Sequence, residues 1–311
     1  MTSQLATAPA TQRLHHQKSV FEYLEDPKAT ACLPSLTCVL NELQTLMRKN
    51  NVDLDEVAKL VQMDVGMSSR VLRMANSAFY APPEPVVDVK EAILNMGLST
   101  FRRALLAANC IELTSHVPHS ILEWKEFWLH AAGVGHLTME LSYRLKNPGA
   151  DAESFYLMGL MHDIGKVVLA HVMPVEFEKI YRETAAQKRS PAELELETLG
   201  IDHGQLGAWY LEKQAMPVMI YEPVRFHHCL ELEERPHFDH ARLIKLADHL
   251  TLYFLLGQSG NHADLGDPFA SKEWKWYLEQ ARHRDADGMM LKDLVMEQVA
   301  KISDLVRKII V

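Results

Sequence analysis

Imidazole and carboxylate side chains recur along the middle of this 311-residue chain in an order that suits metal chemistry. In His162-Asp163 both kinds of donor stand on adjacent residues, whose Cα atoms lie about 3.8 Å apart. A metal ion over the edge of a helix can take both. Lys166 comes four residues after His162, on the same helical face, where its ammonium group can meet the negative charge of a phosphate. The alternative is a structural histidine that its neighbour satisfies at a helix end.

Further residues of the same types stand on both sides of this pair, and the question is whether they converge. They are His130, His203, His227, His228 and Asp248. Histidine is the commonest metal ligand in proteins, and the chain holds 16 histidines. Mixed nitrogen and oxygen donors suit a first-row divalent ion such as iron, manganese, nickel or zinc.

The elements that must position these residues are helices. Apolar residues recur every three or four positions, which predicts helices over 68–75, 91–96, 100–113, 124–145, 154–169 apart from the His-Asp pair, 192–199 and 204–213. No segment of six or more residues alternates in the manner of a strand between turn residues. We therefore predict an all-α fold with two helical lobes.

Composition breaks divide the chain into four segments. We expect a flexible tail over 1–19, an N-terminal helical lobe over 20–115, a metal-binding helical lobe over 116–256, and a loop with C-terminal amphipathic helices over 257–311. The last helix carries an apolar stripe from Leu291 to Ile309, which is expected to dock on the core; a dimer contact is the alternative.

Charge and cysteine content exclude several classes of protein. The net charge is −9 and basic residues form no run, so general nucleic-acid binding is not expected. A chain of this length needs no covalent staples, so its four cysteines do not indicate a disulfide framework. None of them forms a C-x-x-C pair, which argues against a thiolate zinc site. No long apolar segment and no secretory signal is present, so we expect a cytoplasmic protein without a membrane span.

The order His130, His162-Asp163, Asp248 is similar to the ligand set of the HD superfamily of metal-dependent phosphohydrolases. That resemblance implies that these four residues bind metal and that the C-terminal lobe of the all-α fold is an HD-type helical bundle. His203, His227 and His228 look like the extra ligands of the HD-GYP phosphodiesterases, which cleave cyclic di-nucleotides, although the Gly-Tyr-Pro signature is absent after His228. Glu126, one turn before His130, is a further candidate ligand.

The N-terminal lobe resembles the HDOD module, the HD-related output domain. The motifs that carry this resemblance are Leu33-Pro34-Ser35-Leu36, Leu72 to Tyr80, Glu91 to Gly97 and Phe127 to His130. It covers roughly residues 25–255. HDOD modules are bacterial signal-transduction domains, and many have lost the His-Asp ligands that this chain keeps.

These resemblances imply three alternative functions. The first is a regulatory module with one or two divalent ions, Fe or Mn before Ni or Zn, that acts through signalling proteins or a nucleotide-type ligand. The second is an active phosphohydrolase or cyclic di-nucleotide phosphodiesterase, with Asp163 and Lys166 as catalytic residues. The third is a metal-free helical scaffold. A homodimer is an open alternative for its assembly.

Overall fold

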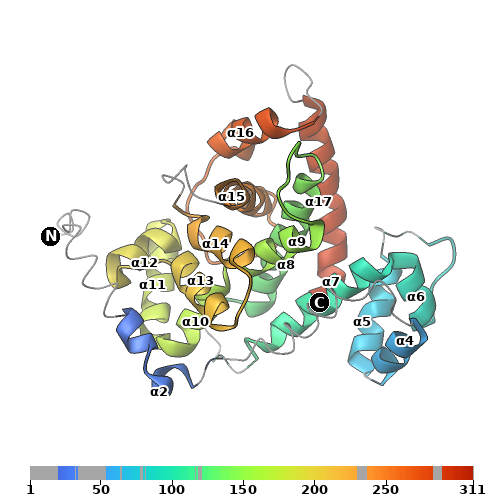
Figure 1. The fold of residues 1–311 in the computed structure, drawn as a ribbon, viewed down its shortest axis with the longest axis horizontal. Helices are drawn as coiled ribbons and strands as arrows, with labels where there is room; N and C mark the ends of the chain where they lie inside the picture. Colours follow the sequence, from blue (N-terminus) through green and yellow to red (C-terminus); the bar gives the residue numbers. More distant parts are fainter. Residues whose placement is uncertain are drawn as a thin grey trace. The chain divides into compact units, whose positions relative to one another are not determined.

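Helices make up all the regular structure that is described. The computed structural model describes residues 20–31, 33, 54–63, 65–77, 80, 82–115, 117, 121–229, 237–282 and 289–310. Figure 1 shows the arrangement of these helices. Within these ranges the only extended pairing is an isolated antiparallel bridge between Leu145 and Ala281. The predicted all-α fold is therefore confirmed. The expected tail over 1–19 lies outside the described residues.

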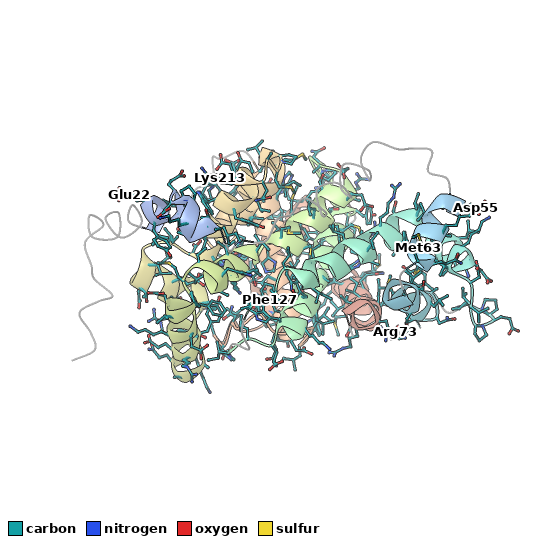
Figure 2. The ribbon with its side chains drawn as sticks, turned by 90° about the horizontal axis from the view of Figure 1, so that it is seen from below. Glu22, Asp55, Met63, Arg73, Phe127 and Lys213 are labelled. Carbon is teal, nitrogen blue, oxygen red and sulfur yellow. The ribbon has the colours of Figure 1, made fainter. Side chains whose placement is uncertain are left out.

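The chain forms two compact units, each built from two separate stretches of sequence. The larger unit contains residues 1–35 and 116–284, and the smaller contains residues 36–115 and 285–311. This division differs from the four consecutive segments expected from the sequence. The chain begins in the larger unit, where the Tyr23 hydroxyl donates to the Val172 carbonyl at 3.4 Å. Glu25 forms an ion pair there at 3.0 Å with Lys213, which is labelled in Figure 2.

The smaller unit is a helical bundle that the C-terminal helix completes. Its helices are α4 (Leu54–Gln62), α5 (Val65–Ala75), α6 (Val89–Met96), α7 (Leu98–Glu112) and α17 (Met289–Ile310). The apolar stripe of α17 packs against α5 and α7, which buries Leu291, Val295, Val299, Ile302, Leu305 and Val306. Asp55, Met63 and Arg73 lie on the outside of this bundle (Figure 2). The stripe thus docks within the fold, as the sequence predicts.

The side chain of Asn76 closes the proline-rich turn that follows α5. Its Nδ2 donates to the Val86 carbonyl and its Oδ1 accepts from the Val86 amide, both at 2.8 Å. Asp88 then caps α6 by accepting from the Glu91 amide at 3.0 Å.

The larger unit packs its helices around α8 and α9. Its elements are α2 (Pro27–Thr30), α8 (Trp124–Ser142), α9 (Ala152–Met161), α10 (Ile164–Val172), α11 (Pro174–Gln187), α12 (Pro191–Leu199), α13 (His203–Lys213), α14 (Val218–Phe226), α15 (Phe238–Tyr253), the 3-10 turn η1 (Pro268–Ala270) and α16 (Lys272–Gln280). Helix α8 packs on α9 and α15, and α13 packs on α10 and α14. Almost every residue of α8 and α9 is buried, including Phe127 (Figure 2), so these helices form the core.

None of the described helices combines the length and apolar character needed to cross a bilayer.

Candidate metal centre

The seven candidate ligands lie within or at the ends of six helices of the larger unit. His130 lies within α8 and Asp248 within α15, while His203 is the first residue of α13. The other four stand at helix ends: His162 and Asp163 between α9 and α10, and His227 and His228 after α14. The structure brings all seven into one cluster.

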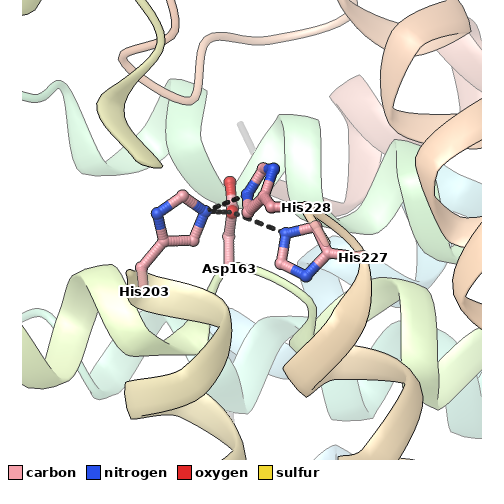
Figure 3. Close-up of side chains that lie close together, drawn as sticks. All are labelled: Asp163, His203, His227 and His228. Carbon is pink, nitrogen blue, oxygen red and sulfur yellow. Dashed lines mark hydrogen bonds and ion pairs between the residues drawn. The ribbon is translucent and has the colours of Figure 1, made fainter. Parts of the chain in front are cut away.

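Four of these residues form what we call the His203 group: Asp163, His203, His227 and His228. Their ligand atoms all lie within 4.8 Å of one another. Asp163 Oδ1 is 2.9 Å from His203 Nε2 and 4.0 Å from His227 Nε2. The Nε2 atoms of His203 and His228 face each other at 2.7 Å (Figure 3). Three imidazoles and one carboxylate oxygen therefore point at a common volume.

Asp163 also belongs to a second set, the His130 group of His130, His162 and Asp163, whose ligand atoms likewise lie within 4.8 Å. His162 Nε2 is 3.3 Å from Asp163 Oδ2. Asp248 extends this group, because its Oδ1 is 3.0 Å from His130 Nε2 and 3.9 Å from His162 Nε2. One carboxylate, Asp163, is thus shared by two neighbouring sets of donors.

Hydrogen bonds to the outer nitrogen fix the orientation of the rings. His162 Nδ1 lies 2.7 Å from the Gly159 carbonyl, and His227 Nδ1 lies 2.6 Å from the Val224 carbonyl. Because a carbonyl only accepts, each Nδ1 carries the proton and each Nε2 presents a lone pair to the cluster. This is the arrangement that metal-binding histidines adopt.

His203 is oriented by Glu195, which the sequence reasoning missed. Oε2 of Glu195 accepts from His203 Nδ1 at 2.6 Å and from its backbone amide at 2.7 Å. The Tyr181 hydroxyl donates to the other oxygen at 3.1 Å. The signal was present, because Ala192, Glu195 and Leu199 follow one another at helical spacing on the buried face of α12.

Five buried polar atoms of the cluster form no well-directed hydrogen bond within the part of the chain that is described, although two of them, His130 Nε2 and Asp248 Oδ1, lie 3.0 Å apart. The five atoms are His130 Nδ1, His130 Nε2, His162 Nε2, His227 Nε2 and Asp248 Oδ1. An unsatisfied buried polar atom costs about 1–3 kcal/mol. All of these except His130 Nδ1 face other potential ligand atoms of the two groups, where divalent cations would satisfy them. The residues present therefore fit a first-row metal ion.

The ionisation of the cluster follows from its burial and its mutual charges. Burial, helped by the neighbouring rings of His162 and His203, lowers the pKa of His227 to about 3. Burial also lowers the pKa of His228 well below its usual range. Burial acts against the charge of Asp163, but His162, Lys166 and His203 outweigh it and hold the pKa of this carboxyl well below its usual range. An anionic carboxylate therefore faces the neutral imidazoles of His227 and His228.

His203 departs from this pattern. Burial opposes its positive charge, but Glu195 and Asp163 outweigh burial and raise the pKa of this ring to about 9. The metal-free His203 thus holds a proton at neutral pH, which a bound ion would displace.

Lys166 lies differently from the expectation. The helix is interrupted at His162 and Asp163, so Lys166 and His162 do not lie on one continuous helical face. Instead Lys166 Nζ, on a side chain that is 3% exposed, lies 2.6 Å from Asp163 Oδ2 and 3.0 Å from the Ser259 carbonyl. The Lys166 ammonium group is therefore already paired within the protein.

Residues 257–260 form part of the wall of the site. Gly257 has φ +76° and lies so close to α8 that a Cβ atom there would meet the His130 backbone. The next amide, of Gln258, donates to the Glu126 carbonyl at 3.0 Å. The candidate ligand Glu126 therefore contributes its backbone here, and neither ligand group includes its carboxylate.

A glycine contact holds α10 against α13. A Cβ atom on Gly165 would overlap the His203 carbonyl, and a Cβ atom on Gly207 would lie 2.9 Å from the Gly165 amide nitrogen. This close approach of two backbones sets Asp163, at the start of α10, opposite His203, at the start of α13.

The chain is similar to known proteins over most of its length. Residues 33–230 match the family model of the HDOD domain. A protein of uncharacterised function from Treponema pallidum (strain Nichols) is 24% identical over 227 residues, which are 73% of this chain and 43% of that protein. The chain therefore spans less than half the length of this relative.

Solved structures share the fold at low sequence identity. An HDOD domain protein of unknown function from Geobacter sulfurreducens has a TM-score of 0.74 at 19% identity, over 96% of this chain and 98% of that one. A Marinobacter aquaeolei VT8 protein, provisionally named a signal transduction protein, gives 0.72 at 19% identity, over 98% and 68%. A Shewanella amazonensis SB2B protein, provisionally named a metal-dependent phosphohydrolase, gives 0.60 at 17% identity, over 94% and 99%. These likenesses establish the fold.

Proposed function

This chain belongs to the HDOD domain family, and on that basis we propose that it is a metal-binding module of signal transduction. The chain would bind one or two divalent ions, with Fe or Mn preferred over Ni or Zn. The proposed ligands are His130, His162, Asp163, His203, His227, His228 and Asp248. The module acts through signalling proteins or a nucleotide-type ligand. The observation that carries the proposal is the set of buried donor atoms that form no well-directed hydrogen bond and face one another.

Burial of the ligand set favours a regulatory role over turnover. His130, His162, His203 and His227 are at most 1% exposed. Lys166, the residue expected to meet a substrate phosphate, is bound to Asp163 and Ser259 instead. In this arrangement a bound ion would connect several helices of the larger unit, so that its binding changes the stability of the surface that a partner contacts.

Metal titration of the purified chain tests this function. The metal-free protein is titrated without oxygen with Fe²⁺, Mn²⁺, Ni²⁺ and Zn²⁺, and the unfolding temperature is followed. We expect stabilisation by at least one of these ions, lost in H203A and retained in H262A, whose histidine is exposed and outside the cluster. No stabilisation by any ion would support the metal-free scaffold.

A second candidate is a metal-dependent phosphohydrolase or cyclic di-nucleotide phosphodiesterase. The observation in its favour is the sharing of Asp163 by two donor groups, because two neighbouring metal ions stabilise the attacking and leaving oxygens in phosphatases and nucleases. A bound ion would supply Lewis acidity toward a phosphoryl oxygen. Lys166 would have to leave Asp163 to neutralise a phosphate. Hydrolysis of a cyclic di-nucleotide by the loaded chain, lost in K166M, would establish this candidate.

A further inference from the structure

Glu195 is a buried charge that belongs to neither ligand group. It is 0% exposed, and three donors use its carboxylate: the backbone amide and Nδ1 of His203, and the Tyr181 hydroxyl. Burying a carboxylate is costly unless it is paired and hydrogen-bonded. The contacts with His203 and Tyr181 are what keep this charge inside the protein.

The partner of His203 differs in charge from the partners of the other oriented rings. His162 and His227 each donate to a neutral backbone carbonyl. His203 donates to an anion at 2.6 Å, and a hydrogen bond to a charged acceptor is roughly twice as strong as a neutral one. A carboxylate behind a ligating imidazole also makes the other ring nitrogen a better donor to metal. His203 Nε2 is therefore the strongest imidazole donor of the three.

The contacts of Asp163, the shared carboxylate, also favour the His203 group as the first to bind an ion. Asp163 presents Oδ1 to His203 at 2.9 Å, whereas Oδ2, the oxygen nearer His162, lies 2.6 Å from the Lys166 ammonium. A cation bound in the His130 group would have to approach this ammonium and compete with it for Oδ2. The His203 group thus has an additional anion, Glu195, behind it, which favours a bound cation. The His130 group has an additional cation, Lys166, beside it, which disfavours one.

We propose, on the basis of the metal-binding function above, that Glu195 is a positioning residue that makes the His203 group the first to bind an ion, ahead of the His130 group. Loading is sequential, and Glu195 sets its order through the ring of His203.

The test is a Co²⁺ titration of the full-length, metal-free chain, followed by the absorption of the bound ion and by equilibrium dialysis. We expect the wild-type chain to bind a first ion more tightly than any second one. E195Q, which removes the charge but keeps the shape, should weaken the first ion about 10–100-fold and change its spectrum. E193Q is the matched control, because Glu193 stands on the same helix with a side chain that is 61% exposed. It should behave as wild type.

A second pair of variants keeps the test decisive if E195Q does not fold. H203A should lose the tight first ion, whereas H130A should keep it. Failure of the wild-type chain to bind any Co²⁺ would overturn the proposed function together with this inference. Two results would overturn only the order of loading. In the first, the wild type binds Co²⁺ but E195Q behaves like E193Q. In the second, the tight first ion survives in H203A and disappears in H130A.

Discussion

Lys166 and Asp163 form a buried ion pair at the centre of the cluster, with Nζ 2.6 Å from Oδ2 and both side chains 3% exposed. The pair neutralises the carboxylate that both donor groups share. In the metal-free chain, Lys166 is thus a built-in cation beside the place where a metal ion is proposed to bind.

Replacing Lys166 should therefore destabilise the metal-free chain more than the loaded one. In K166M the Asp163 carboxylate stays buried without its partner, which typically costs about 3–5 kcal/mol. A divalent ion should restore part of this loss, because it takes over the neutralisation of Asp163. Denaturant unfolding with and without Mn²⁺ measures the difference.

K213M serves as the control for this variant. Lys213 pairs with Glu25 at the surface, where ion pairs contribute about 0–1 kcal/mol. Equal losses of stability in K166M and K213M, or a loss in K166M that Mn²⁺ leaves unchanged, would contradict the role given to Lys166.

The contact of Gly165 with α13 predicts an intolerant position. The Cβ of alanine would overlap the backbone carbonyl of His203, which side-chain motion cannot relieve. We expect G165A to lower the free energy of unfolding by about 1–3 kcal/mol or more. In G133A the nearest atoms to the new methyl group belong to the side chains of Leu256 and Thr251, which can shift, so the loss should be clearly smaller than in G165A. Urea unfolding of both variants checks this; similar costs would show that the backbone contact is unimportant.

Metal affinity should rise with pH. Although burial opposes it, the carboxylates of Glu195 and Asp163 raise the pKa of His203 to about 9, so an ion must displace a proton from this ring at neutral pH. Affinity should increase by up to about tenfold for each pH unit below about 9 and level off above it. Calorimetric titration with Mn²⁺ across this range, in buffers of different ionisation enthalpy, also counts the released proton. A dissociation constant that does not change with pH would contradict the protonation of His203.

The sequence predicted those features that local spacing of residue types determines. Helical periodicity predicted the all-α fold, and the apolar stripe of 291–309 predicted the docking of α17. The sequence also singled out seven histidines and aspartates, and the structure brings them together from within or beside six helices. Their role as metal ligands remains a proposal.

The remaining features depend on contacts between distant segments. Glu195 reaches His203 because α12 packs beside α13, and its charge on an apolar face carried no indication of its partner. The contact of Lys166 with Ser259 joins residues 93 positions apart. Residues 257–260 read as the start of a separate segment, because their glycines mark a loop whether or not that loop lines a site. Such pairings follow from packing, which local spacing does not specify.

The central claim is that the cluster around Asp163 holds divalent metal, and elemental analysis of the purified chain tests it most directly. The wild-type chain and H262A, prepared without oxygen and reconstituted with Fe²⁺ or Mn²⁺, should each retain one or two ions per chain after dialysis. D163N, which removes the carboxylate shared by both groups, should retain almost none. A wild-type chain that keeps no ion under either condition, or a D163N variant that keeps as much as wild type, would contradict the claim.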